Sequence, residues 1–172
     1  MNFVKYALLA FIVLSSPALA NGQGAYRDGA YPKAFEAFLP LANSGDAESQ
    51  YYLGLMYSKG QAVPQDAIMA VSWYQKAADQ GHPLAQNNLG FMYGQGSGVK
   101  KDFVQAHMWY SLAAAAGIVL SQENRALIAL KMTSRQITEG QRLAREWMAQ
   151  YKGAGMNDPQ ATKIKGAGTK TQ

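Results

Sequence analysis

An internal repeat constrains the fold of this chain more than any other feature of its sequence. Residues 45–80 align with residues 81–116 without a gap, and 14 of the 36 positions are identical. A fixed period between about 20 and 50 residues marks a solenoid, in which each unit buries its apolar face against its neighbours. The sequence therefore predicts at least two stacked copies of one structural unit.

Each copy has the pattern of two helices joined by a short loop. In the first helix, Ser49, Leu53 and Tyr57 recur at four-residue spacing, and in the second an apolar stripe runs through Trp73 and Tyr74. The signature positions of the first copy are Leu53, Gly54, Tyr57, Gly60, Trp73, Tyr74 and Gly81. Those of the second copy are Leu89, Gly90, Tyr93, Gly96, Trp109, Tyr110 and Gly117.

The ends of these helices are marked by residues that cap helices. Asp66 and Asp102 are predicted to be N-caps of the second helices, where a carboxylate accepts the free backbone amides. Gly60 and Gly96 are expected to end the first helices. Gly45, Gly81 and Gly117 stand just past the second helices, where a left-handed residue suits glycine.

Two glycines lie inside the first helices, where each costs about 1 kcal/mol relative to alanine. Gly54 and Gly90 occupy the same position in the two copies. We expect them to permit a close approach between helices, with the space filled by Trp73 or Trp109, because burying a large aromatic outweighs the glycine penalty.

Ala85 through Gly117 carry the pattern A-Q-x-x-L-G-x-M-Y-x-x-G-x-G-V-x-x-D-x-x-x-A-x-x-W-Y-x-x-A-A-x-x-G, which resembles the Sel-1-like repeat family, related to the tetratricopeptide repeats. The first copy departs from it at Ser49 and Ala62, two small replacements that we expect the fold to accept. The resemblance implies an all-α fold: an α-solenoid of antiparallel helix pairs with a 36-residue period and terminal capping helices.

The segments outside the two full repeats complete the predicted organisation of the chain. Residues 21–151 are expected to form the repeat domain, in which a half-repeat over 30–44, similar to a lone second helix, precedes the repeats at 45–80 and 81–116. Capping helices follow over 121–151, one at 127–132 and another opened by a capping box at Thr133 and Gln136. Residues 152–172 are predicted to be a disordered basic tail.

Residues 1–20 are predicted to be a signal peptide. Lys5 precedes a short apolar run, and Ala18-Leu19-Ala20 is a small-x-small cleavage signal. The run is about half of the ~20 residues that span a membrane. We therefore expect cleavage after Ala20, no integral membrane segment afterwards, and a periplasmic or secreted protein.

Composition argues against several classes of function. The chain has no cysteine, which excludes a disulfide framework and a thiolate metal site. Its net charge of +5 comes mainly from the tail and the leader, so no nucleic-acid-binding face is expected. His82 is predicted to be a turn residue and His107 to face solvent or the rim; no catalytic, metal or cofactor site is predicted, and the chain is not expected to be an enzyme.

The predicted function is binding of a protein or peptide on the concave side, which the first helices line in solenoids of this kind. The positions of the first helix that face away from its core stripe are expected to form the surface, because tyrosine, leucine and phenylalanine suit a binding hot spot. They are Glu48, Tyr51, Tyr52 and Leu55 in the first copy and Leu84, Asn87, Asn88 and Phe91 in the second.

Two alternatives to protein binding remain open. A cell-wall or polysaccharide-binding module is possible because exposed tyrosines also stack on sugars, and a hydrolase ranks last because no polar constellation for it is visible. The family resemblance implies a regulatory or assembly role in the cell envelope. Neither the partner nor the process can be identified from these residues.

Overall fold

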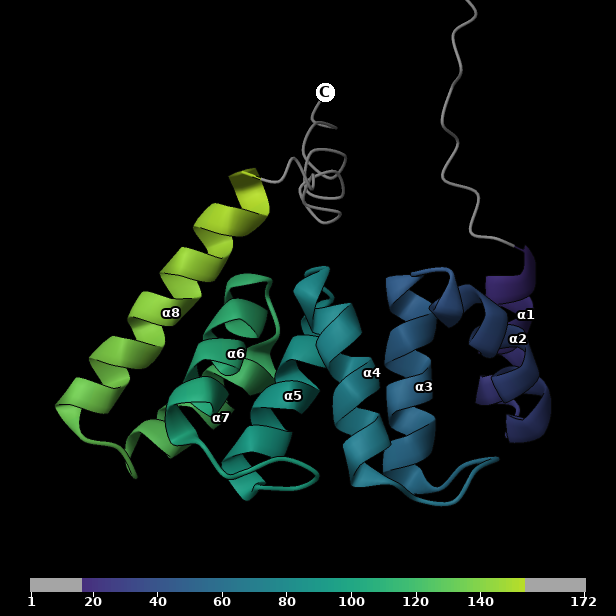
Figure 1. The fold of residues 1–172 in the computed structure, drawn as a ribbon, viewed down its shortest axis with the longest axis horizontal. Coiled ribbons are helices and arrows are strands. Elements are labelled where there is room, and N and C mark those ends of the chain that lie inside the picture. Colours follow the sequence, from purple (N-terminus) through teal and green to yellow (C-terminus); the bar gives the residue numbers. More distant parts are fainter. Residues whose placement is uncertain (1–16, 154–172) are drawn as a thin grey trace, which may run out of the picture.

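The computed structural model describes residues 17–153, and these residues form eight α-helices. In chain order they are α1 (Pro17–Arg27), α2 (Tyr31–Asn43), α3 (Ala47–Lys59), α4 (Ala67–Asp79), α5 (Pro83–Gln95), α6 (Phe103–Ala115), α7 (Val119–Ala129) and α8 (Ser134–Gly153). Consecutive helices from α1 to α7 pack against each other in a row of antiparallel elements (Figure 1). The predicted all-α solenoid is confirmed, and none of the described helices is long and apolar enough to cross a membrane.

The predicted caps form in both repeats. One carboxylate oxygen of Asp66 accepts the backbone N–H groups of Ile68 and Met69 at 2.9 Å, and Asp102 does the same for Val104 and Gln105. Each carboxylate thus satisfies two of the backbone donors that a helix N-terminus leaves free. The first helices end at Gly60 and Gly96, both in the left-handed conformation.

Tyrosines, and not the expected tryptophans, fill the space above the two helical glycines. A Cβ on Gly54 would come within 2.5 Å of the Tyr74 ring, and one on Gly90 within 2.8 Å of the Tyr110 ring. Neighbouring residues point about 100° apart around a helix, so Tyr74 faces its own first helix whereas Trp73 turns toward the preceding unit, where it packs with Phe38. The prediction of a close approach is confirmed, and the assignment of Trp73 or Trp109 to it is wrong.

The helix over residues 31–43 has a partner, although the sequence suggested a lone second helix. α1 pairs with α2, and Gly22 lies against the Phe38 ring as Gly54 lies against Tyr74. The loop between the two helices is shorter by four residues than the loop between α3 and α4. The predicted cleavage point after Ala20 falls inside α1, so that cleavage would remove the first four residues of this helix.

The C-terminal helices differ from the repeated units. α7 ends at Ala129, and Leu130–Met132 form a turn, so the helix expected over 127–132 is wrong beyond Ala129. The capping box at the start of α8 is confirmed: Thr133 and Gln136 exchange side-chain to backbone hydrogen bonds in both directions. Lys152 and Gly153 extend α8, and the rest of the predicted tail lies outside the described residues.

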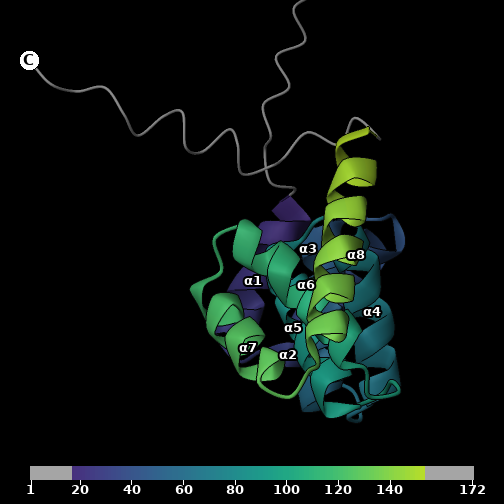
Figure 2. The ribbon, with the colours of Figure 1, turned by 90° about the vertical axis from the view of Figure 1, so that its left-hand side faces the viewer.

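α8 packs along α6 and not along its chain neighbour α7. Trp147 meets Trp109 edge to face, and the Tyr151 hydroxyl donates a 2.9 Å hydrogen bond to the carbonyl of Gln80 at the end of α4. α8 therefore covers the side of the molecule that α4 and α6 form. Figure 2 shows α4 and α8 on this side and α1 and α7 on the other.

Candidate partner-binding face

The first helices α1, α3, α5 and α7 form one side of the molecule, here called the first-helix face. The eight residues predicted to bind a partner all lie on α3 and α5, at repeat-equivalent positions 36 residues apart. The structure divides them into residues that bond to neighbouring units and residues that are open to solvent.

Glu48 belongs to a polar bridge that joins three units. Its carboxylate accepts a hydrogen bond from the Gln23 amide of α1 at 3.1 Å and lies 3.0 Å from Nε2 of His82. The other ring nitrogen of His82 accepts the backbone N–H of Ala85, so His82 is the N-cap of α5 and Nε2 carries the proton that Glu48 accepts. The prediction of His82 as a turn residue is confirmed, and Glu48 holds the units together.

Tyr51 and Tyr52 have their rings against internal partners. The Tyr51 ring stacks on His82 with centroids 4.7 Å apart, and the Tyr52 ring stacks on Phe38 at 4.5 Å. Burial, with the neighbouring Tyr52 and Tyr26 phenols and Glu48 adding to it, raises the pKa of Tyr51 to about 12. Both rings are half-buried and each has one face stacked on an internal partner, which leaves less open aromatic surface for a sugar to stack on.

The two asparagines also bond within the fold. Asn87 accepts the hydroxyl hydrogen of Ser121 on α7 at 2.8 Å and donates to Asn88. Asn88 in turn bonds to the phenol of Tyr74, which is buried in the core. These amides connect α5 to α7 and to α4.

Leu84 and Phe91 are the open residues of the predicted set. Their exposed fractions are 42% and 51%, whereas Leu55 at the position equivalent to Phe91 packs against the core. A leucine and a phenylalanine seven residues apart lie on the same line along α5, two turns from each other. This pair is the part of the predicted surface that can contact a partner without rearrangement.

Two further residues, which the sequence analysis missed, continue this line onto α7. Leu120 and Leu127 stand 36 residues after Leu84 and Phe91, and their exposed fractions are 55% and 60%. A third application of the 36-residue period would have identified them, although residues 117–132 lack the rest of the repeat signature. The four side chains Leu84, Phe91, Leu120 and Leu127 are called the apolar row below.

His107 is buried, with 3% of its surface exposed, and the expectation of a solvent-facing or rim position is wrong. α8 covers it, because Gly140 lets that helix approach the imidazole closely. Burial, together with the positive charge of Arg125, lowers the pKa of His107, so the ring stays neutral at pH 7. In residues 17–153 no three His, Asp or Glu side chains gather closely enough to hold a metal ion.

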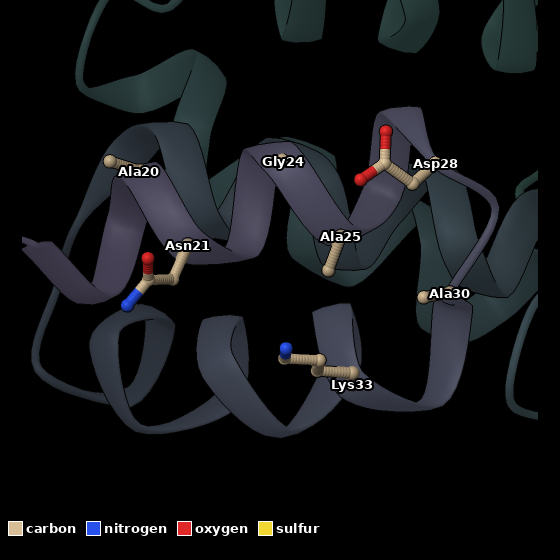
Figure 3. A pocket seen from close by; sticks show the side chains of 7 residues that line it. All are labelled: Ala20, Asn21, Gly24, Ala25, Asp28, Ala30 and Lys33. Atoms are coloured by element: carbon tan, nitrogen blue, oxygen red, sulfur yellow. The ribbon is translucent and has the colours of Figure 1, made fainter.

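A hollow of about 370 Å³ lies at the other end of the molecule, between α1 and α2. Asn21 and Lys33 extend into the space between the two helices (Figure 3). Asp28 and four small residues complete its lining. This arrangement brings no nucleophile or acid–base pair together.

Comparison with known families identifies the repeated unit. Residues 47–82 and 83–118 each match the Sel1 repeat. The matches begin two residues later than the repeats at 45–80 and 81–116 and have the same 36-residue period. They cover the four helices α3 to α6.

Solved structures and a curated protein also resemble the chain. A crystal structure of c5321, a protective antigen of uropathogenic Escherichia coli with an SLR fold, matches 90% of this chain with a TM-score of 0.74 and 28% identity. A Sel1 repeat protein from Oxalobacter formigenes matches with a TM-score of 0.58 and 32% identity. This match covers 63% of the present chain and 85% of the length of the Oxalobacter protein. DAP3-binding cell death enhancer 1 of Rattus norvegicus is 40% identical over 50 residues. The chain spans a third of the length of the E. coli antigen and a tenth of the rat protein.

Proposed function

This chain is a Sel1-repeat protein, and on that premise we propose that it is an exported, non-catalytic scaffold that binds another protein through its first-helix face. The repeat fold is a helical scaffold consistent with a protein-interaction module. The name of the rat relative also describes a protein that binds another protein.

The apolar row carries this proposal. Four large apolar side chains at equivalent positions of two neighbouring units are between 42% and 60% exposed. Exposed apolar side chains that gather in one place mark interaction sites, whereas scattered ones need no explanation. Leu84 and Phe91 on α5 and Leu120 and Leu127 on α7 are such a group, placed on adjacent helices.

A protein partner fits this surface better than a glycan. Sugars stack on open aromatic faces, but the Tyr51 and Tyr52 rings are stacked on His82 and Phe38. The apolar row consists of leucine and phenylalanine side chains, which can pack against the apolar side chains of a helix or peptide from the partner. We propose that the partner takes part in an assembly or regulatory process of the cell envelope.

Affinity capture from an envelope extract tests the binding role. The double variant Leu84→Asp with Phe91→Asp should lose a protein band that the unchanged chain retains, because two charges in an apolar contact remain unpaired. Ile68→Asp is the matched control, since Ile68 is a 70% exposed apolar residue on α4, away from the row. Equal retention by the double variant and the control would remove the row from the binding surface.

Export is tested by the mass of the mature chain. The leader predicts that the protein recovered from cells begins at Asn21, and that Ala18→Leu with Ala20→Leu leaves a longer precursor because large side chains block cleavage. Intact-mass spectrometry of both forms decides this point. A chain that begins at Met1 and remains in the cytoplasm would contradict export.

A further inference from the structure

Helix α7, the last first helix of the solenoid, is poorly covered. Of its 11 residues only Ser121 and Ile128 are buried. Val119 is 65% exposed and Leu130, the residue that caps its C-terminal end, is 84% exposed. Figure 2 looks onto this end of the molecule, where α8 lies along α6 and leaves α7 uncovered within the described residues.

The repeat register shows what these exposed positions do elsewhere in the molecule. Val119, Glu123 and Leu130 are equivalent to Pro83, Asn87 and Gly94 of α5. Asn87 bonds to Ser121 of α7, and the Ile128 side chain packs over Gly94 so closely that a Cβ there would lie 3.0 Å from it. One unit earlier, Tyr51 at the position of Asn87 stacks on His82 at the start of α5.

The positions of Glu123 and Leu130 therefore face the first helix of the next unit where a next unit follows, and Val119 lies on the same line along α7, one turn before Glu123. On α7 they are called the stacking face: Val119, Glu123 and Leu130. In residues 17–153 no helix lies against it, although two of its three side chains are large and apolar. A terminal unit usually ends a solenoid with a polar outer face, and this one does not.

The composition of the two ends indicates which surface covers the stacking face. The opposite end of the solenoid, at α1, presents Asn21, Asp28 and the Lys33 ammonium beside a hollow. Head-to-tail stacking of two copies would therefore place the apolar side chains of α7 against polar ones. A second α7 offers the same apolar side chains as the first. Self-complementary contact of one patch with its own copy is the geometry of a two-fold dimer.

The spacing along α7 suits such a pairing when the two helices run antiparallel. Val119 and Leu130 lie at equal distances from the midpoint between Asn124 and Arg125. A two-fold axis at this midpoint places Val119 of one copy opposite Leu130 of the other, twice in the same interface. It also places Glu123 opposite the small Ala126 of the partner, with the two Glu123 residues about 4.5 Å apart along the helix axis, so their like charges weaken the contact.

We propose that this protein forms a homodimer through its stacking face, with α7 paired antiparallel to α7 of a second copy. Leu120 and Leu127, which belong to the apolar row, border the contact. Together with Val119 and Leu130 they present roughly 400–500 Å² per copy, about the size of the largest apolar patch on a typical monomer, which is often functional. Stable interfaces bury about 800 Å² on each partner, so this dimer belongs among the weaker ones.

Mass measurements on the purified protein test the dimer. Light scattering and sedimentation should show the average mass rise from one chain toward two as the concentration increases through about 1–100 µM. Val119→Asp with Leu130→Asp should remain one chain at every concentration, with unchanged circular dichroism because both residues are exposed. Ile68→Asp should dimerise as the unchanged protein does, and a single chain at all concentrations for the unchanged protein would overturn the proposal.

Engineered cysteines test the orientation, since the chain contains no other cysteine. Antiparallel helices should give disulfide-linked dimers for Val119→Cys with Leu130→Cys, but not for either single variant, whose two copies of the residue would lie about 16 Å apart along the helix axis. Equal cross-linking of the single variants, or none of the double variant, would overturn the antiparallel pairing. These experiments use the protein by itself, so their outcome is separate from capture of an envelope partner.

Discussion

One methyl group distinguishes Ala62 from Gly98, which occupy equivalent positions in the loops between the paired helices. Ala62 has φ +65° and its counterpart Gly98 has φ +68°, so an alanine occupies a left-handed conformation that costs about 1–2 kcal/mol for a residue with a Cβ. The fold accepts Ala62, as expected, but with backbone strain. At Gly98 a Cβ would also come within 2.2 Å of the Ala67 carbonyl oxygen, because this loop lies against the start of α4.

Replacing Ala62 by glycine and replacing Gly98 by alanine should have opposite effects on the free energy of unfolding. Ala62→Gly relieves the strain and should stabilise the protein by about 0.5–1 kcal/mol, after allowing for the greater freedom of glycine in the unfolded chain. Gly98→Ala introduces both strain and a backbone clash and should destabilise by more than ~2 kcal/mol. Urea unfolding measures both variants, and similar values for the two would contradict this account of the loop.

The buried phenols give the fold a sensitivity to alkali. Burial raises the pKa of Tyr51 and of Tyr110 to about 12, against an ordinary value of about 10. The folded chain therefore holds these protons more tightly than the unfolded chain. The stability that this contributes is complete below about pH 10 and is lost as the pH rises toward 12.

The midpoint of urea unfolding should thus decrease between pH 10 and 12. Tyr51→Phe with Tyr110→Phe should flatten this decrease, because phenylalanine has no proton to lose. Circular dichroism across the pH series measures the effect, with pH 8 as the reference at which both chains are folded. An equal pH dependence of the unchanged and substituted chains would show that these phenols do not control it.

At the scale of the elements, the first helices α1, α3 and α5 are each bound to the second helix of the same pair through a glycine and an aromatic ring. The pairs are Gly22 with Phe38, Gly54 with Tyr74 and Gly90 with Tyr110. This contact recurs in the first pair, although α1 lacks the leucine and tyrosine of the first-helix signature at the equivalent positions. The glycine–aromatic contact occurs in all three pairs, whereas the first pair has no tryptophan, so this contact defines the distance between paired helices.

Gly54→Ala tests this contact. The new methyl group overlaps the buried Tyr74 ring, and the overpacking of about 1–3 kcal/mol should exceed the helix-propensity gain of about 1 kcal/mol. Gly24→Ala in α1 is the control, because a Cβ there has no neighbour within 4 Å and should stabilise by up to ~1 kcal/mol. Thermal unfolding of both variants checks the sign, and stabilisation by Gly54→Ala would contradict the close approach.

The sequence predicts the units that keep the fixed period and fails where the period is interrupted. The caps at Asp66 and Asp102 follow from local hydrogen bonding, which a sequence pattern can express. α1 does not fit the 36-residue period because the loop after it is four residues shorter than the loop between α3 and α4. The position of α8 depends on tertiary contacts such as Gly140 against His107, and no local pattern encodes which distant helix it covers.

At the scale of the whole molecule, the two sides have different roles. α8 closes the side of α4 and α6, with its Trp147 and Tyr151 anchored on Trp109 and Gln80. Within residues 17–153, no further helix covers the first-helix face. Of the predicted surface, five residues bond to neighbouring units, so the sequence could not separate bonded side chains from exposed ones. They are Glu48, Tyr51, Tyr52, Asn87 and Asn88.

Photocross-linking in living cells tests whether the exposed apolar row receives a protein partner. A benzoylphenylalanine at position 91 should form adducts with one or a few discrete proteins, of masses other than that of two copies of this chain. The same probe at position 68, an apolar site of α4 that is more exposed than Phe91, should form none. No adduct at position 91, or the same adducts from both positions, would contradict the account.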